Sequence, residues 1–169
     1  MNLNTPEPEE LVIIVDDENQ EQMVVTRSIM RKQNLIHRSA FTVVLNSEDK
    51  ILVLQRSSSK DLYPSMYEIT CTGVVQPYES FEKCALRELL EELSIRRPSL
   101  TFIDLFYDEN EQNRVWGSLF KIIWDQELCF DEQEVAWGTF LNFHEVETLI
   151  EQGKCTPESS FILEMLTSQ

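Results

Sequence analysis

Three glutamates near the middle of the chain have the spacing that clusters side chains on one face of a helix. Glu88, Glu91 and Glu92 stand at positions i, i+3 and i+4, and a helix with 3.6 residues per turn projects such side chains together. On the opposite side of the helix we place Leu86, Leu89, Leu90 and Leu93. The spacing therefore predicts a two-sided helix, with leucines entering a core and carboxylates facing solvent.

Such a cluster of carboxylates is a candidate site for a divalent cation. Mg2+ takes oxygen ligands and is usually held by one or two carboxylates together with substrate phosphates. Carboxylates without compensating charge raise one another's pKa, so the cluster attracts either cations or protons. The same spacing is also typical of the solvated face of an amphipathic helix. The surrounding residues must decide between the two interpretations.

The surrounding residues carry a longer pattern. Residues 73–95 read GVVQPYESFEKCALRELLEELSI, in which Gly73, Glu79 and the run Arg87-Glu88-Leu89 are followed by Glu91, Glu92 and Ile95. This resembles the Nudix box, G-x5-E-x7-R-E-U-x-E-E-x-G-U, where U is an aliphatic residue. Every defined position matches except the second glycine, which is Ser94 here. So many fixed positions make the pattern far more specific than helical spacing alone.

The resemblance implies a fold, an activity and a ligand set. The implied fold is an α/β/α sandwich around a mixed sheet, and the implied activity is metal-dependent hydrolysis of a pyrophosphate. Glu88, Glu91 and Glu92 would bind Mg2+, for which Mn2+ is a substitute, and Arg87 would pair with Glu79 in a structural ion pair. Metal at the glutamates would polarise phosphoryl oxygens and lower the pKa of the attacking water.

Two further positions of the pattern have a backbone interpretation. Gly73 supplies a residue without a Cβ, as needed where a strand turns sharply or a phosphate comes close. Serine at position 94 costs little unless its φ is positive, in which case we expect strain.

The expected reaction is attack of water on phosphorus in a nucleoside diphosphate derivative or a related small molecule. Glu92 is a catalytic candidate through the metal that it binds. The attacking water also needs a proton acceptor. Glu88 is ranked first, and the alternative is a carboxylate of the loop at 132–134, for which Glu134 is the candidate.

Three basic residues are candidates for binding the substrate. Arg56 closes a predicted strand and Lys60 lies in the polar loop that follows. The guanidinium fork of arginine matches phosphate oxygens, although surface cations at a strand end are an equally good interpretation. Arg114, at the start of the later segment RVWGSLFKIIW, is the third candidate.

The chain beyond the box also resembles the branch of the superfamily that contains isopentenyl diphosphate isomerase. The shared segments are NLIHRSAF, QRSSSKDLYPSMYE and RVWGSLF. These isomerases use a cysteine just before the box glycine and a histidine just after it, where this chain has Thr72 and Val74. Cys71 is one residue early and so points to the opposite face of a strand, and His37 is interpreted as structural. We therefore predict a hydrolase, with an isomerase and an inactive binding module as alternatives.

Composition restricts the partners. A net charge of −16 argues against binding nucleic acid or anionic membranes, whereas a bound metal makes a small phosphorylated substrate compatible. Four scattered cysteines without a CxxC pair indicate buried reduced thiols. No apolar run is long enough to span a membrane. We expect a cytoplasmic protein, and the sequence leaves a homodimer open.

The predicted elements alternate between α and β. With 169 residues, 42% of them hydrophobic, we expect one domain at 11–169 after a flexible tail at 1–10. Thr26 is expected to cap the first helix, Ser80 the box helix, and Thr156 a last helix with Pro157 in its first turn. The predicted ranges are a hairpin of 11–15 and 22–25, a helix at 27–32, a second hairpin of 40–45 and 51–55, strands 67–75, 100–107, 114–124 and 135–141, and a helix from 143 onward.

Overall fold

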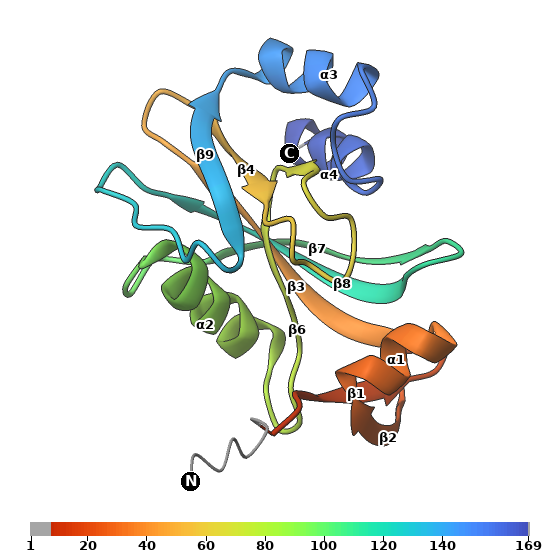
Figure 1. Ribbon diagram of the computed structural model, residues 1–169. Coiled ribbons are helices and arrows are strands. Elements are labelled where there is room, and N and C mark those ends of the chain that lie inside the picture. The colour runs from red at the N-terminus through yellow and green to blue at the C-terminus, as the bar shows by residue number, and fades with distance from the viewer. Residues whose placement is uncertain (1–7, 169) are drawn as a thin grey trace, which may run out of the picture.

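A computed structural model describes residues 8–168 of the chain. A mixed nine-stranded sheet lies between α2 on one face and α3 with α4 on the other (Figure 1). The strands are β1 (Leu11–Val15), β2 (Glu21–Thr26), β3 (His37–Leu45), β4 (Ile51–Arg56), β5 (Tyr67–Glu68), β6 (Cys71–Val74), β7 (Thr101–Glu109), β8 (Arg114–Ile123) and β9 (Val135–Leu141). The helices are α1 (Arg27–Gln33), α2 (Phe81–Leu93), α3 (Phe143–Glu151) and α4 (Ser159–Thr167). The predicted α/β/α sandwich with an N-terminal hairpin is confirmed.

Strand β3 is the centre of the sheet. It pairs in parallel with β8 along its whole length and antiparallel with β6, while β4 pairs with β9 and β5. The predicted hairpin of 40–45 and 51–55 was wrong beyond its tip, because only Leu45 and Ile51 are partners. Each strand is paired with other neighbours, so the two separate after the turn. The strand predicted at 67–75 is likewise two strands, β5 and β6.

The two faces of β3 contribute to two different cores, because successive side chains of a strand point to opposite faces. Phe41 and Val43 pack in a cluster that includes Val146 of α3 and Ile162 of α4. Val44 packs in a second cluster with leucines of α2. These two apolar layers fix the helices on either side of the sheet.

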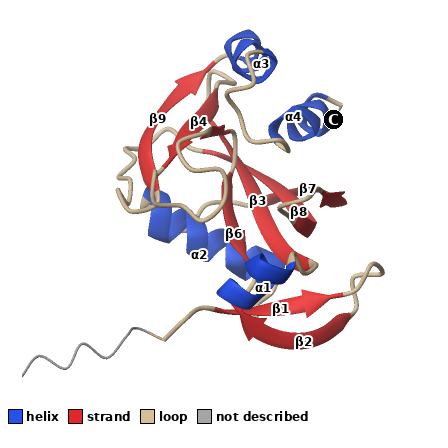
Figure 2. Cartoon of the chain, turned by 45° about the vertical axis from the view of Figure 1, so that its right-hand side comes forward, coloured by secondary structure: helices blue, strands red, loops and turns tan. Residues whose placement is uncertain are grey.

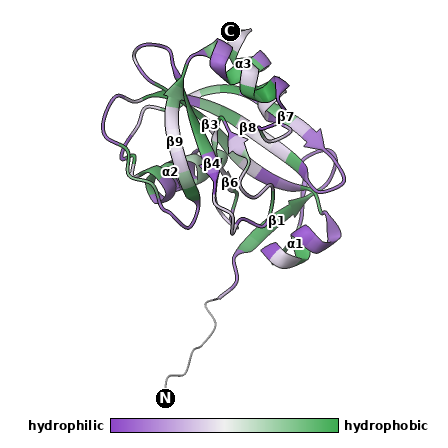
Figure 3. Cartoon of the chain, turned by 45° about the horizontal axis from the view of Figure 1, so that its top comes forward, coloured by the Kyte–Doolittle hydropathy of each residue, from purple (hydrophilic) through white to green (hydrophobic). Residues whose placement is uncertain are grey.

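The N-terminal hairpin and α1 form an extension at one end of the sheet (Figure 2). β1 is hydrophobic, whereas α1 beside it is largely hydrophilic (Figure 3). Val12, Ile14 and Met30 pack together with Val74 of β6, so the extension is anchored to the sheet by apolar contacts. Of the tail predicted at 1–10, residues 1–7 lie outside the described residues.

Three helices begin with side-chain caps. The Thr26 hydroxyl accepts a hydrogen bond from the backbone N–H three residues on at 3.5 Å, and the Ser80 hydroxyl does the same at 3.2 Å. Asn142 and Glu145 form a capping box at α3. The predicted start of the last helix was wrong, because α4 begins two residues later than Pro157. Thr156 donates its backbone N–H to the carbonyl of Tyr67 in β5 at 2.8 Å, which ties the chain before α4 to the sheet.

The orientation of α2 differs from the sequence prediction. Leu86 and Leu90 are 39% and 40% exposed, whereas Glu88 and Glu92 are only 9% and 4% exposed. The helix packs on β3 and β6 with an arc centred near Ala85, and this arc includes both glutamates. The predicted two-sided arrangement was therefore wrong for Leu86, Leu90, Glu88 and Glu92. It holds for Leu89 and Leu93, which are buried, and for Glu91, whose side chain is 57% exposed.

Ser94 ends α2 in the left-handed conformation, with φ 59° and ψ 23°. This conformation costs a residue with a Cβ about 1–2 kcal/mol, so we expect Ser94→Gly to increase the free energy of unfolding by about 0.5–1 kcal/mol after the added chain entropy. Urea denaturation measures the change. The control is Ser99→Gly, at an exposed serine that does not have a positive φ. A Ser94→Gly protein less stable than the parent would contradict the strain.

The cysteines are free, as predicted. Cys71, Cys84 and Cys155 are buried, but Cys129 is exposed, so the prediction of buried thiols was wrong for this residue. Among residues 8–168, no helix has the length and apolar character needed to cross a bilayer.

Candidate active site

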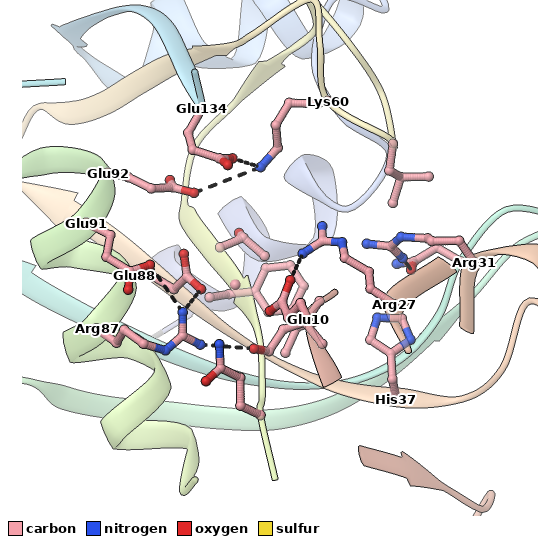
Figure 4. Close-up of a pocket in the computed structure, with 18 of the residues that line it drawn as sticks. Glu10, Arg27, Arg31, His37, Lys60, Arg87, Glu88, Glu91, Glu92 and Glu134 are labelled. Carbon is pink, nitrogen blue, oxygen red and sulfur yellow. Dashed lines mark hydrogen bonds and ion pairs between the residues drawn. The ribbon is translucent and has the colours of Figure 1, made fainter. Parts of the chain in front are cut away.

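A cavity of about 700 Å³ lies between α2, α1 and the loops that follow β4 and precede β9. Glu88, Glu91 and Glu92 of α2 line one wall, and Arg27 and Arg31 of α1 line the wall opposite (Figure 4). The three glutamates singled out by their spacing therefore share one cavity. The sheet determines this arrangement, since α2 and the N-terminal extension are both packed against it.

Gly73 makes room for the first of these glutamates. A Cβ placed on Gly73 would lie 2.1 Å from side-chain atoms of Glu88, including one carboxylate oxygen. The glycine is therefore required by the close approach of Glu88 from α2. The sequence interpretation, which invoked a sharp turn or a phosphate, named the wrong neighbour.

Gly73→Ala is expected to displace the Glu88 carboxylate and to reduce activity by on the order of a hundredfold, because an error of about 1 Å in a reacting group can cost that much. Stability should change little, since the obstructing atoms belong to the end of a flexible side chain. Gly153→Ala is the control: its φ of 67° predicts strain far from the cavity. Kinetics and thermal melting distinguish the two variants, and an active Gly73→Ala protein would contradict the role of Glu88.

Arg87 connects the elements of the box. Its guanidinium donates to both carboxylate oxygens of Glu79, at 2.7 and 3.0 Å, so the ion pair implied by the resemblance is present. It also donates to Glu88 at 2.5 Å, to Glu91 at 3.4 Å and to the carbonyl of Val74 at 3.1 Å. Arg87 therefore fixes the loop before α2 and orients the glutamates at the same time.

The two buried glutamates are incompletely compensated. Burial raises the pKa of Glu88 to about 7, against the opposing effect of Arg87. Burial also raises the pKa of Glu92 well above its ordinary value, and the negative charges of Glu68 and Glu88 add to the effect. The nearest cation to Glu92 is Lys60, at 4.0 Å. A cation in the cavity would stabilise both carboxylates in their ionised form.

The donor set fits the divalent metal that the box implies. All three candidate ligands are carboxylates, which suit a hard cation, and two of them are buried without full compensation. Among residues 8–168 no three acidic, histidine or cysteine side chains already converge as a ligand set. Arg87 holds Glu88 and Glu91, so their carboxylates must turn from it to reach a shared cation.

Lys60 and Glu134 meet on a third side of the cavity (Figure 4). They form an ion pair with each other, and Lys60 also faces Glu92. The structure thus brings the candidate phosphate-binding lysine, the candidate base and a candidate metal ligand together. These residues come from the loop after β4, the loop before β9 and α2.

Of the two arginines predicted to bind substrate, only Arg56 lies at the cavity. Arg56 lines the cavity, but its guanidinium donates to Glu68 at 2.8 Å and to the carbonyl of Leu62 at 2.8 and 3.0 Å. Arg114 lies on the β7–β8 hairpin, where it pairs with Glu109 at 3.4 Å, and it is not part of the cavity wall. The structure therefore does not bring Arg114 to the predicted site.

Several residues of the cavity were not recognised as site residues from the sequence, among them Arg27, Arg31 and Glu10. Arg27 and Arg31 stand at positions i and i+4 and so share one face of α1, which is the signal that could have found them. His37 also lines the cavity. Burial, together with the charges of Arg31 and Arg27, lowers its pKa to about 3, so this histidine is neutral.

Comparison with known proteins identifies the family of the chain. The family model of the NUDIX domain matches residues 35–158. The uncharacterized Nudix hydrolase YfcD of Escherichia coli K12 is 36% identical over 150 residues, which cover 89% of this chain and 82% of that protein. An uncharacterized Nudix hydrolase of Pseudomonas aeruginosa, PA4841, is 30% identical over 148 residues, covering 88% and 86%.

Solved structures share the fold at lower identity. The crystal structure of DR0079 from Deinococcus radiodurans has a TM-score of 0.81 at 19% identity, covering 92% of this chain and 98% of that one. The NUDIX domain of Shewanella oneidensis NrtR, in complex with ADP ribose, has a TM-score of 0.62 at 13% identity, covering 85% and 98%. Because the family model spans most of the sequence and the fold is of the Nudix type, the chain belongs to the Nudix hydrolase family.

Proposed function

We propose that this Nudix hydrolase uses Mg2+, or Mn2+ as a substitute, to cleave the pyrophosphate bond of a nucleoside diphosphate derivative or a related small molecule. The supporting observation is the burial of Glu88 and Glu92, 9% and 4% exposed, in the wall of a large cavity. Two such carboxylates are costly in a protein unless a cation or protons compensate them. Binding of a divalent cation would offset the free-energy cost of burying the two carboxylates.

Five residues of the cavity have a defined task in this proposal. Glu88, Glu91 and Glu92 would hold the divalent ion, which when bound supplies Lewis-acid activation of phosphoryl oxygens and of the attacking water. Lys60 stands beside Glu92 and can bind a phosphoryl oxygen as a point charge. Arg87 keeps the carboxylates of the helix oriented between turnovers.

Two carboxylates on the cavity wall can accept the proton of the attacking water. Glu88 lies on α2 and Glu134 on the loop before β9, and both line the cavity. Their isosteric variants, Glu88→Gln and Glu134→Gln, separate the roles. The base is the residue whose replacement flattens the acidic limb of the pH–rate profile, where the rate rises as the base ionises, when the profile is measured at saturating metal.

Two observations support the proposed class of substrate. The NrtR domain is in complex with ADP ribose, and a similar nucleoside diphosphate ester is therefore a candidate for this cavity. The net charge of −16 disfavours nucleic acid as the substrate. We propose small-molecule partners on the same grounds.

Isomerisation is the second candidate reaction, because the sequence resembles the isopentenyl diphosphate isomerase branch. The Cys71 thiol contacts Glu92 at 3.5 Å, so a thiol does lie near the carboxylate cluster. However, Cys71 is only 2% exposed and does not line the cavity, whereas Thr72 does. Threonine is far less acidic than a thiol, which favours hydrolysis.

A panel of pyrophosphates tests the proposed function. ADP ribose, UDP-glucose, coenzyme A and isopentenyl diphosphate are incubated with the protein and Mg2+, and 31P NMR follows the products. We expect hydrolysis of at least one nucleoside diphosphate ester, complete inhibition by EDTA and no conversion of isopentenyl diphosphate to its isomer. Isomerisation abolished by Cys71→Ser, or turnover in excess EDTA, would contradict the proposal.

A further inference from the structure

The wall of the cavity opposite the glutamates is cationic. Arg27 and Arg31 project from successive turns of α1 into the cavity (Figure 4), and their side chains are 27% and 18% exposed. The apolar contacts of the N-terminal extension with β6 hold α1 in place. The two guanidinium groups are therefore held at a fixed position across the cavity from the proposed metal ligands.

Asp61 alone does not balance the positive charge of this pair. Both guanidinium groups share the carboxylate of Asp61, with Arg27 at 2.9 and 3.3 Å and Arg31 at 3.2 Å. The other partner of Arg31 is the neutral amide oxygen of Asn113, at 3.0 Å. Burial lowers the pKa of Arg31, and the charges of Arg27 and Arg56 oppose its protonation further. Two partly buried cations thus share the carboxylate of Asp61, and a second negative charge must come from elsewhere.

The remaining partner of Arg27 is a carboxylate that enters the cavity from the chain just before β1. Glu10 accepts a hydrogen bond from the Arg27 guanidinium at 2.9 Å, with 29% of its side chain exposed. Figure 4 shows this carboxylate between the arginines and the glutamates of α2. A protein carboxylate therefore occupies the place that an oxyanion of a ligand would take on Arg27.

We propose that Arg27 and Arg31 form a second anion-binding subsite, and that the preferred substrate carries, apart from its pyrophosphate, a further anionic group that displaces Glu10. A phosphate monoester and a carboxylate share the required chemistry, because both present paired oxygens to a guanidinium fork. The inference rests on the proposed function, which assigns the pyrophosphate to the glutamate side of the cavity.

Binding of inorganic phosphate in EDTA tests the subsite without reference to catalysis. Calorimetric titration is performed on the parent protein and on Arg31→Gln, Glu10→Gln and Arg38→Gln. Arg38 is the matched control, because it pairs with Glu21 and does not line the cavity.

We expect Arg31→Gln to weaken phosphate binding about tenfold, as for the loss of one charge-assisted contact. Glu10→Gln should strengthen binding, since it removes a competing carboxylate, and Arg38→Gln should bind like the parent. Unchanged affinity in Arg31→Gln, or weaker binding in Glu10→Gln, would show that the arginines serve only to tie α1 to the loop of Asp61.

Matched substrate pairs identify the source of the anion. Coenzyme A against 3′-dephospho-coenzyme A tests a phosphate monoester, and UDP-glucuronate against UDP-glucose tests a carboxylate. In one pair we expect the member with the extra anion to have a KM about tenfold lower. We expect Arg31→Gln to remove this difference by raising the KM of that member.

If Arg31 has a merely structural role, Arg31→Gln should reduce activity equally on both members of each substrate pair. That result would overturn the subsite, and so would a parent protein without any preference for the member with the extra anion. The failure of every pyrophosphate to react would instead contradict the proposed hydrolase function. In that case the phosphate titration still decides whether the subsite exists.

Discussion

Glu92→Gln is expected to reduce turnover by about a hundredfold or more while leaving the fold intact. Loss of the charge removes a proposed metal ligand, and metal activation supplies several kcal/mol of the reduction in the barrier. Glutamine has the same shape, and a neutral amide is less costly than a carboxylate at a position only 4% exposed. We therefore expect a melting temperature, measured in EDTA, at or above that of the parent.

The matched control is Glu82→Gln, an exposed glutamate in the first turn of the same helix. It should keep both activity and stability. A Glu92→Gln protein that turns over substrate like Glu82→Gln would show that Glu92 has no part in the chemistry.

Arg87→Ala is expected to lower stability and activity together. The substitution leaves Glu79, whose side chain is 12% exposed, without its bidentate partner and removes the contact with the Val74 carbonyl. A carboxylate left unpaired in a largely buried position costs a few kcal/mol. Urea denaturation gives the free energy of unfolding, and steady-state kinetics give the activity.

Arg87→Lys separates the two roles of the arginine. Lysine keeps the charge but cannot form the two-pronged contact with Glu79, so we expect an intermediate loss of stability. If Arg87→Ala were as stable as the parent, the ion pair between Arg87 and Glu79 would not be what holds the loop before α2 against the helix.

The sequence was sufficient for the order of elements and for the grouping of the glutamates, because both depend on local patterns. The caps at Thr26 and Ser80 rest on hydrogen bonds that span three residues, and both are present. The orientation of α2 was not predictable from its leucines. The sheet determines which arc is buried, and it accommodates Glu88 because Gly73 has no side chain.

The cationic half of the cavity was missed for a different reason. Arg27 and Arg31 lie in the N-terminal extension, more than 50 residues before the glutamates of α2 in the sequence. Only the packing of the extension against β6 brings them to the same cavity. Arg114 shows the converse, since a residue chosen for its type lies on a hairpin away from the cavity.

Binding of Mn2+ measured by electron paramagnetic resonance tests the central claim most directly, because free and protein-bound Mn2+ give different signals. The parent protein is titrated alongside Glu92→Gln and the control Glu82→Gln. Our account predicts saturable binding to the parent and to Glu82→Gln, and affinity at least about tenfold weaker in Glu92→Gln. Equal affinity in all three proteins, or no binding to the parent, would contradict a metal site on α2.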